Sequence, residues 1–273
     1  MATVGANSAT LSDLARRSEE DNKKIAKIVE ILNDTNEILD DMMFMEGNLP
    51  TGHKTTMRSG LPDVTWRMLY QGVPNSKSRT VQVTDTIGML EAYSEVDKSL
   101  ADLNGNTMEF RLSEDVAFLE AMSQEMASTV FYGNTATDPE KFMGLAPRYN
   151  SLSAHNAENV IQADGTGSDN TSIYLVLWGD RTCHGIYPKG SKMGLHHEDK
   201  GQQTLQDSDG NNYEGYRSHY KWDMGMVLKD WRYVVRICNI DISNLTKNAA
   251  TGSDLVDLMT QALEVPPSLN AGS

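Results

Sequence analysis

Residues 61–84, LPDVTWRMLYQGVPNSKSRTVQVT, carry the pattern that decides the fold. Two runs within them, residues 64–70 and 79–84, partly alternate polar and apolar side chains as strands do, and residues 72–76 supply turn chemistry. Too few apolar side chains point one way for such a ribbon to carry its own core, and an isolated two-stranded ribbon is marginal in water. We therefore expect a long ribbon that lies on a neighbouring molecule.

Aromatic and cationic side chains interleave along this ribbon, at Trp66, Arg67, Tyr70, Lys77 and Arg79. One interpretation is a surface that stacks on single-stranded nucleic acid and neutralises it. The other is a protein interface, where Trp, Tyr and Arg are enriched. The whole chain has a net charge of −14, with 24 Lys and Arg against 38 Asp and Glu, which repels a phosphate backbone. We therefore predict that these side chains contact another subunit.

The segment before the ribbon is predicted to be helical. Its apolar positions follow an i, i+3, i+4, i+7 stripe, made by Ile25, Ile28, Val29 and Leu32, and the opposite positions are charged. A single narrow apolar face on a terminal helix must pack against something. We expect the stripe to contact a neighbouring subunit.

The segment after the ribbon contains the clearest helix of the chain, predicted at about residues 106–132. Apolar residues recur there at spacings of three, four or seven, acidic residues lie near the N-terminal end, and Gly133 with Asn134 ends the pattern. A second face of the same helix is also apolar. We expect a helix that is covered on more than one side.

The last third of the chain is predicted to be rich in strands. Residues 173–178 and 233–238 read as buried strands, with a hairpin tip at residues 207–212 between them. A final amphipathic helix is predicted to start at an N-cap, Ser253, and to end before Pro266 and Pro267.

Two clusters of histidine and acidic residues are candidate metal sites. His196 and His197 are followed by two acids, which suits a metal, but neighbours on a strand point to opposite faces and no spaced set of histidines completes a site. A solvated loop is the preferred interpretation, and a metal-dependent hydrolase remains the alternative. Asp207, Asp209 and Asn211 have the spacing of a calcium loop but lack its bidentate Glu, so we predict a turn.

The two cysteines and the hydropathy of the chain limit the environments that we expect for it. Cys183 and Cys238 lack CxxC spacing, which predicts buried reduced thiols, and His184 beside Cys183 is predicted to be part of a buried strand. No apolar run approaches the roughly 18 residues of a membrane span, and the N-terminus has no secretory signal pattern. We expect synthesis in the cytoplasm, without cofactors.

The order of these parts resembles the tailed-bacteriophage major capsid proteins of the Hong Kong 97-like fold. The sequence similarity is concentrated in residues 61–67, 71–78 and 88–97, and it extends into residues 178–180 and 185–190. The resemblance implies an α+β fold in four parts: an N-terminal helical arm at 1–45, an extended β-ribbon E-loop at 46–95, a peripheral domain with a long spine helix at 96–150, and a mixed α/β axial domain at 151–273.

The resemblance also implies a structural role and no enzymatic activity. Such proteins form hexamers and pentamers of an icosahedral shell around double-stranded DNA, without sequence-specific recognition and without a membrane. Decoration, scaffolding and portal proteins are expected partners, and the virion is the expected location, after assembly in the host cytoplasm. An encapsulin-like compartment shell is the alternative. The family normally continues beyond a helix such as the one ending near Glu264, so we expect an incomplete chain or a reduced axial domain.

Overall fold

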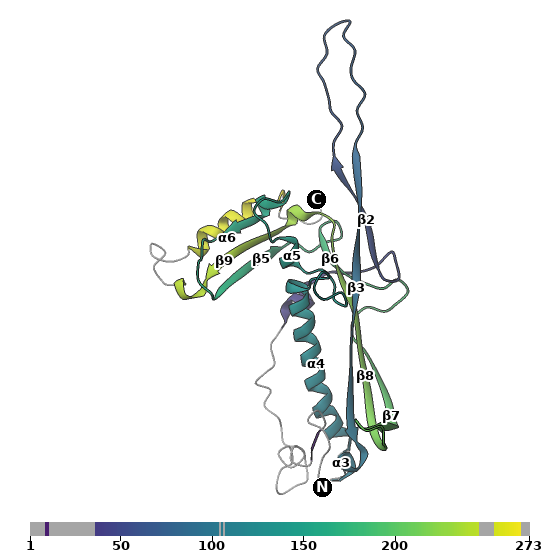
Figure 1. Cartoon of the computed structure of the whole chain (residues 1–273). Coiled ribbons are helices and arrows are strands. Elements are labelled where there is room, and N and C mark those ends of the chain that lie inside the picture. Colours follow the sequence, from purple (N-terminus) through teal and green to yellow (C-terminus); the bar gives the residue numbers. More distant parts are fainter. Residues whose placement is uncertain (1–8, 11–35, 104, 106, 246–253, 269–273) are drawn as a thin grey trace. The chain divides into compact units, whose positions relative to one another are not determined.

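The computed structural model describes residues 9–10, 36–103, 105, 107–245 and 254–268 (Figure 1). The chain forms two compact units. Unit 1 comprises residues 1–40, 89–128 and 194–223, and unit 2 comprises residues 41–88, 129–193 and 224–273. The predicted helical arm with Ile25, Ile28, Val29 and Leu32 lies outside the described residues.

The larger sheet has the strand order β1-β6-β8-β3-β2, and β7 pairs with β8 (Figure 1). β1 and β6 are parallel, whereas the pairs β2–β3, β6–β8 and β7–β8 are antiparallel. β3 and β8 are long enough to contribute residues to both units. The strands are β1 (Phe44–Glu46), β2 (Gly52–Gly60), β3 (Arg79–Asp97), β6 (Cys183–Tyr187), β7 (His196–Gln206) and β8 (Asn212–Leu228).

The predicted ribbon is present, but its first strand and its turn were placed wrongly. β2 pairs with β3 from Gly52 opposite Thr86 to Gly60 opposite Arg79, with a bulge near the far end. Residues 64–70 are not a strand, because they lie beyond the last pair and have no partner. The chain reverses at residues 68–71, where the Gln71 N–H donates to the Met68 carbonyl at 3.2 Å, and not at residues 72–76.

The long helix is confirmed as α4 (Thr107–Tyr132), 26 residues long. In unit 1 its Phe110 side chain is buried in a small apolar cluster with Val96 and Ala101. The shorter helices are α2 (Glu37–Asp41), α3 (Lys98–Asp102) and α5 (Leu145–Arg148).

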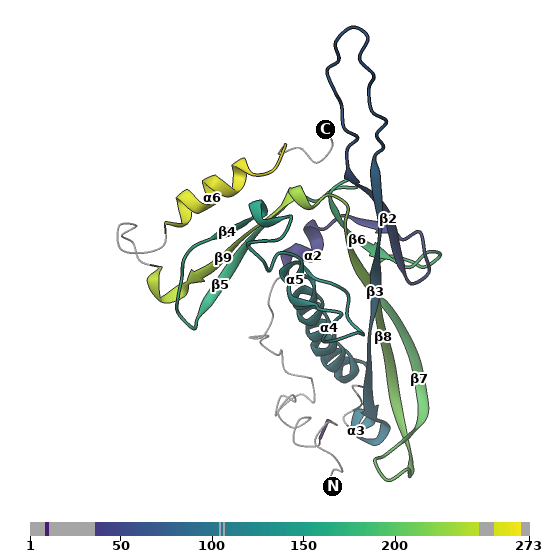
Figure 2. The ribbon, with the colours of Figure 1, turned by 45° about the horizontal axis from the view of Figure 1, so that its top comes forward.

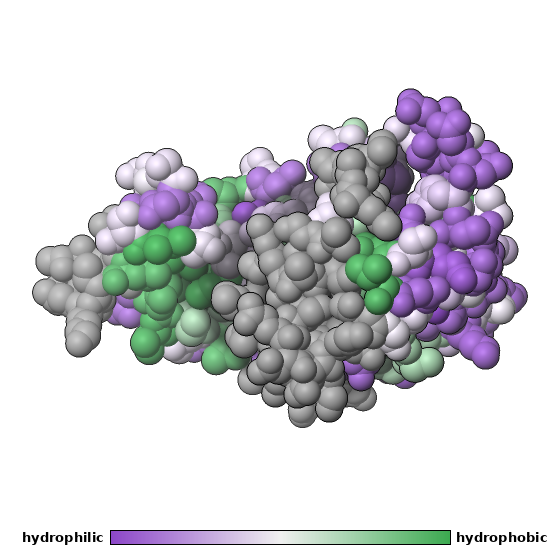
Figure 3. Space-filling model, turned by 90° about the horizontal axis from the view of Figure 1, so that it is seen from below, coloured by the Kyte–Doolittle hydropathy of each residue, from purple (hydrophilic) through white to green (hydrophobic). Residues whose placement is uncertain are grey.

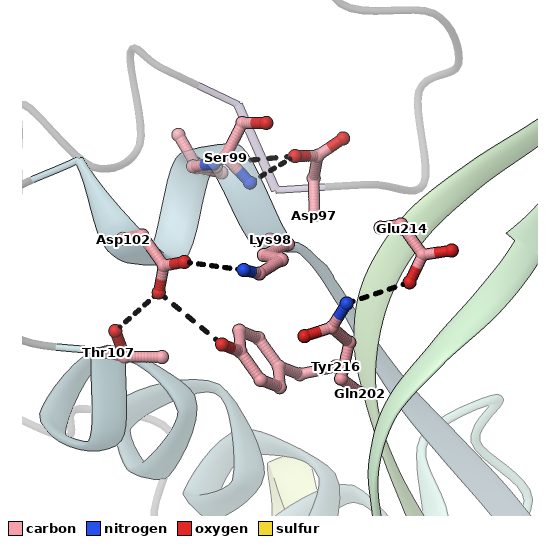
Figure 4. A network of polar contacts seen from close by, with 9 residues as sticks. Asp97, Lys98, Ser99, Asp102, Thr107, Gln202, Glu214 and Tyr216 are labelled. Atoms are coloured by element: carbon pink, nitrogen blue, oxygen red, sulfur yellow. Dashed lines mark hydrogen bonds and ion pairs between the residues drawn. The ribbon is translucent and has the colours of Figure 1, made fainter.

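Polar contacts fix the short connection from β3 through α3 to α4 in unit 1 (Figure 4). The Asp97 carboxylate caps α3 by accepting from the Ser99 N–H at 2.7 Å. At the other end of α3, Asp102 accepts from the Thr107 hydroxyl at 2.7 Å and from the Tyr216 hydroxyl at 3.5 Å (Figure 4). These hydrogen bonds, led by that from Thr107, lower the pKa of Asp102. The start of α4 is thereby tied to α3 and to β8.

The β7–β8 ribbon of unit 1 is mostly hydrophilic. In Figure 3 it lies at the right of the view, where the surface is purple. His196 and His197 begin β7, so their assignment to a solvated loop was wrong. The sequence of β7 has few apolar residues that could reveal a strand. The strand is held instead by its pairing with β8 at ten positions. The predicted turn at residues 207–212 is confirmed, since the Asp207 carboxylate accepts from the N–H groups of Asp209 at 3.0 Å and Asn211 at 2.8 Å.

Unit 2 contains a second sheet, of order β4-β9-β5, with α6 beside it (Figure 2). Its strands are β4 (Val160–Gln162), β5 (Asn170–Val176) and β9 (Val234–Asp241), so both predicted strands are confirmed. The helix α6 (Leu255–Glu264) packs Ala262 against Val235, Ile237 and Ile240 of β9. Figure 3 shows hydrophobic residues gathered over this part of unit 2.

The start of the last helix differs from the prediction. Its N-cap is Asp254, whose carboxylate accepts from the Asp257 N–H at 3.2 Å, and Ser253 lies outside the described residues. Both cysteines are buried and free, as predicted, and burial is the main cause that raises the pKa of Cys183 to about 12. Within the described ranges, no helix has the length and apolarity needed to cross a bilayer.

Candidate subunit interface

The outermost part of the ribbon, residues 61–78, extends beyond the last β2–β3 pair and is called the E-loop tip below. Its large apolar side chains face solvent. Trp66 is 99% exposed, Val64 is 91% exposed and Leu69 is 86% exposed. Grouped apolar side chains of this size are rare on the surface of a monomer and mark interaction sites.

A few polar contacts define the shape of the E-loop tip. The Ser76 hydroxyl accepts from the Asp63 N–H at 2.8 Å and bridges the two sides of the tip. At the reversal, the Gln71 side-chain oxygen accepts from the Met68 N–H at 3.2 Å, and Tyr70 adopts a φ of 66°. Because no buried apolar cluster supports these contacts among the described residues, the apolar side chains remain available to another molecule.

The five residues predicted to contact another subunit all lie on this ribbon and are exposed. Trp66, Arg67, Tyr70 and Lys77 belong to the E-loop tip, and Arg79 is the first residue of β3. The Arg67 guanidinium donates to the Gln71 carbonyl at 3.4 Å, and its other donors form no hydrogen bond with a described residue. Their role at a subunit interface stays a prediction.

A buried ion pair anchors the inner end of the ribbon in unit 2. The Arg148 guanidinium of α5 lies 2.7 Å from the carboxylate of Asp85 in β3, with 15% and 5% of the two side chains exposed. The same guanidinium donates to the carbonyls of Met143 and Met226, both at 3.3 Å. The pair joins residues 63 positions apart, so no local sequence pattern could have revealed it.

Two histidine rings lie near this anchor, His53 of β2 and His184 of β6. Their ring centroids are 6.1 Å apart in an edge-on arrangement. Burial is the main cause that lowers the pKa of His184 to about 4, and the charge of Lys229 acts in the same direction. Burial and Lys229 also lower the pKa of His53. His184 is therefore neutral near pH 7, in the buried strand that the sequence predicted.

The side chains weighed as metal ligands are not assembled into a site. In the part of the chain that the structure describes, no group of three or more His, Cys, Asp or Glu side chains could hold a metal. His197 instead stacks on Tyr220, with ring centroids 4.8 Å apart. Asp207 uses its carboxylate for the backbone of its own turn. The hydrolase alternative gains no ligand set from these residues.

In a comparison with protein families, residues 20–273 match the model of the Major capsid protein GP7. A chain in the near-atomic cryo-EM structure of bacteriophage Epsilon15 is 39% identical, with a TM-score of 0.78. The alignment covers 98% of this chain and 81% of that one. A comparison with curated proteins found no match.

More distant structures share the fold alone. The SrpI encapsulin complex of Synechococcus elongatus has 10% identity and a TM-score of 0.54, covering 88% of this chain and 99% of that one. A structure from Mycobacterium phage Bobi has 11% identity and a TM-score of 0.51, covering 84% and 98%. The likeness to encapsulin at this identity says nothing of function.

The family match spans nearly the whole chain, and the identity to the Epsilon15 chain is high over almost all of it. Together they confirm the expected fold, a mixed helix-and-sheet structure of the Hong Kong 97 type. They also favour a phage capsid over an encapsulin shell. The chain belongs to the Major capsid protein GP7 family and is the major capsid protein of a tailed bacteriophage.

Proposed function

We propose that this capsid protein self-assembles into the icosahedral head shell of its phage, as hexamers and pentamers around double-stranded DNA. The observation that carries the proposal is the E-loop tip, which exposes Trp66 and Tyr70 almost completely. Burying such aromatic side chains in an interface is a large favourable contribution, whereas leaving them in water brings the single chain no stability.

The proposed contact surface has two parts. The first is the ribbon, through Trp66, Arg67, Tyr70, Lys77 and Arg79, which supply aromatic area and bidentate donors at one exposed place. The second is the helical arm, through the stripe of Ile25, Ile28, Val29 and Leu32. In this scheme residues 1–45 are the arm, 46–95 the E-loop, 96–150 the peripheral domain and 151–273 the axial domain.

The role is proposed to be structural, without catalysis. The net charge of −14 supports a shell that encloses DNA without gripping it, because most of its surface repels phosphate. Assembly would take place in the host cytoplasm before the shell becomes part of the virion. Portal, scaffolding and decoration proteins are the partners that this role requires.

The test compares assembly with the stability of the free subunit in a Trp66→Ala variant. Because Trp66 is 99% exposed, the substitution should change the free energy of unfolding of the unassembled chain by less than about 0.5 kcal/mol. If Trp66 is an interface anchor, the same change should cost about 2 kcal/mol or more per contact, which is more than tenfold in the association constant. Electron microscopy and sedimentation velocity measure shells and capsomers, and thermal unfolding measures the free chain.

Two controls make the result decisive. Leu152→Ala removes another exposed apolar side chain, outside the ribbon, and should leave assembly at the wild-type level. Trp66→Phe keeps an aromatic ring and should recover part of the lost assembly. Wild-type assembly by Trp66→Ala at every concentration would refute the role of the tip, and a wild-type chain that forms no capsomers or shells with its scaffold would refute the proposed function.

A further inference from the structure

A groove of about 1170 Å³ runs along β2 in unit 2. One wall is a continuous run, residues 55–61, and the other wall is made by residues 229–232 with Arg181 and His155. Seven residues of extended chain span about 23 Å at the usual rise of a strand. The groove therefore has the length of a short extended segment.

The charge of the groove is opposite to that of the chain. Arg58, Arg181, Lys229 and Arg232 line it with a single carboxylate, Asp230. Lys229 is paired with Asp180 at 2.9 Å and Arg232 with Asp230 at 2.7 Å. Arg58 and Arg181 have no ion pair with any described residue. Both arginines are exposed, and, in addition to the hydrogen bond from Lys229, the charge of Arg181 helps to lower the pKa of Asp180. With four cationic side chains and one carboxylate, the lining of the groove is positively charged in a chain of net charge −14.

The backbone beside the groove is also open. β2 is the last strand of its sheet. Its first residues are hydrogen-bonded outside the β3 ladder, because the Asn48 side chain bonds to the N–H and carbonyl of Lys54 and the Leu49 N–H donates to the Gly52 carbonyl. From residue 55 to residue 60, the described structure shows main-chain hydrogen bonds of β2 to β3 alone. The Thr55 hydroxyl oxygen is buried and has no hydrogen-bond partner among these residues. Unpaired edge strands accept an added strand through main-chain hydrogen bonds, with side-chain pockets giving specificity.

We propose that this groove binds an extended acidic segment of a second copy of the chain. The inference rests on the proposed function, which places copies side by side, and it names a receptor surface that shares only Leu61 with the E-loop tip. An acidic protein segment satisfies both features at once, because carboxylates pair with Arg58 and Arg181 while its backbone pairs with β2.

A nucleic acid fits the groove less well. Affinity for DNA or RNA rises with the number of phosphates that are neutralised, and only Arg58 and Arg181 are unpaired here. The edge of β2 offers no counterpart to bases, whereas it matches the backbone of a protein strand. A protein segment would therefore contact more of the groove than a nucleic acid would.

The first experiment reverses the two unpaired charges, in full-length Arg58→Glu/Arg181→Glu. Both side chains are exposed, so thermal unfolding of the free chain should stay at the wild-type value. Assembly measured by sedimentation should require at least tenfold more protein. The matched control is Lys54→Glu, which reverses an exposed cation on the same strand outside the groove and should assemble normally.

The second experiment identifies the occupant. Arg58→Lys keeps the charge and supplies an amine that carbodiimide can link to a carboxylate. Shells assembled from a mixture of ¹⁵N-labelled and unlabelled Arg58→Lys chains, without nucleic acid, should yield cross-links that join position 58 of one copy to an Asp or Glu of another. Mass spectrometry distinguishes these mixed-isotope links from links within a copy.

The outcomes separate the two proposals. Normal assembly of the charge-reversed chain, or cross-links only within single copies, overturns the groove proposal and leaves the proposed function standing. A defect of the charge-reversed chain that appears only when nucleic acid is present also overturns it, in favour of a nucleic-acid site. Failure of the wild-type chain to assemble with its scaffold overturns both.

Discussion

The E-loop tip and the base of the same ribbon are built in opposite ways. The tip, residues 61–78, exposes its apolar side chains and is shaped by a few hydrogen bonds such as that between Asp63 and Ser76. The base, around Asp85, Arg148 and His184, buries polar and ionisable groups inside unit 2. The base therefore depends on buried contacts within the chain, whereas the apolar side chains of the tip are not buried by any described residue. Substitutions should affect the two ends of one ribbon differently.

The largest difference is expected from the buried ion pair at the base. Arg148→Ala leaves the Asp85 carboxylate buried without its partner, which should cost about 3–5 kcal/mol in the free energy of unfolding. Urea unfolding of the unassembled chain measures it. The double variant Asp85→Leu/Arg148→Met should recover most of the loss, because it removes both charges. A loss below about 1 kcal/mol in the single variant would contradict the anchoring role.

Two glycines allow the same substitution at both ends of the ribbon. A methyl group at Gly52 would lie 2.3 Å from the Asp85 carbonyl oxygen, whereas nothing lies within 4 Å of one at Gly72 in the tip. Gly52→Ala should therefore destabilise the free chain by about 1–3 kcal/mol. Gly72→Ala should be neutral within about 0.5 kcal/mol. Equal thermal unfolding temperatures for the two variants would refute the contrast.

The base should also show a pH dependence of its stability. Burial holds the pKa of His184 at about 4, below its ordinary value near 6.5, so the unfolded chain binds a proton that the folded chain does not. Stability is full above pH 6.5 and falls as pH drops toward 4, by on the order of 1 kcal/mol once screening is included. Lys229 and His53 act in the same direction, and Asp180 opposes them.

His184→Gln should flatten this pH dependence, because the glutamine side chain does not titrate. Denaturant unfolding at pH 7, 6 and 5 gives the slope for each protein. An unchanged slope in the variant would assign the dependence to other groups.

The smallest effect is expected from the polar bridge of the tip. Ser76→Ala removes the acceptor of the Asp63 N–H, in an exposed place where water replaces it, so the free energy of unfolding should change by less than about 0.5 kcal/mol. Hydrogen exchange at the Asp63 amide should nevertheless become faster. Unchanged exchange would show that the bridge does not hold the tip.

The sequence predicted elements whose signal is local. The 26-residue α4 was found because its apolar residues repeat over several turns, and the turn at Asp207 was found from its residue types. The strand predicted at residues 64–70 failed because alternation alone provides no partner. β7 was missed because its ordering comes from β8 rather than from apolar residues of its own.

The candidate interface was predictable only in part. The sequence was enough to propose the ribbon residues from Trp66 to Arg79 as interface residues, because aromatic and cationic side chains interleave there. The anchor of Asp85 on Arg148 and the groove beside β2 were not, because they bring together residues far apart in the chain. Long-range pairs leave no periodic trace in the sequence.

The exposed tip has a consequence for the life of the free subunit. Exposed loop tips are the preferred sites of proteolytic nicking, and Arg67 and Lys77 offer two cleavage points to proteases that cut after basic residues. A cut there leaves the β2–β3 ladder intact, so the subunit would keep its fold while losing a continuous tip. Every free subunit is thus open to cleavage at the tip before it is incorporated, so fast incorporation would limit the loss of intact subunits.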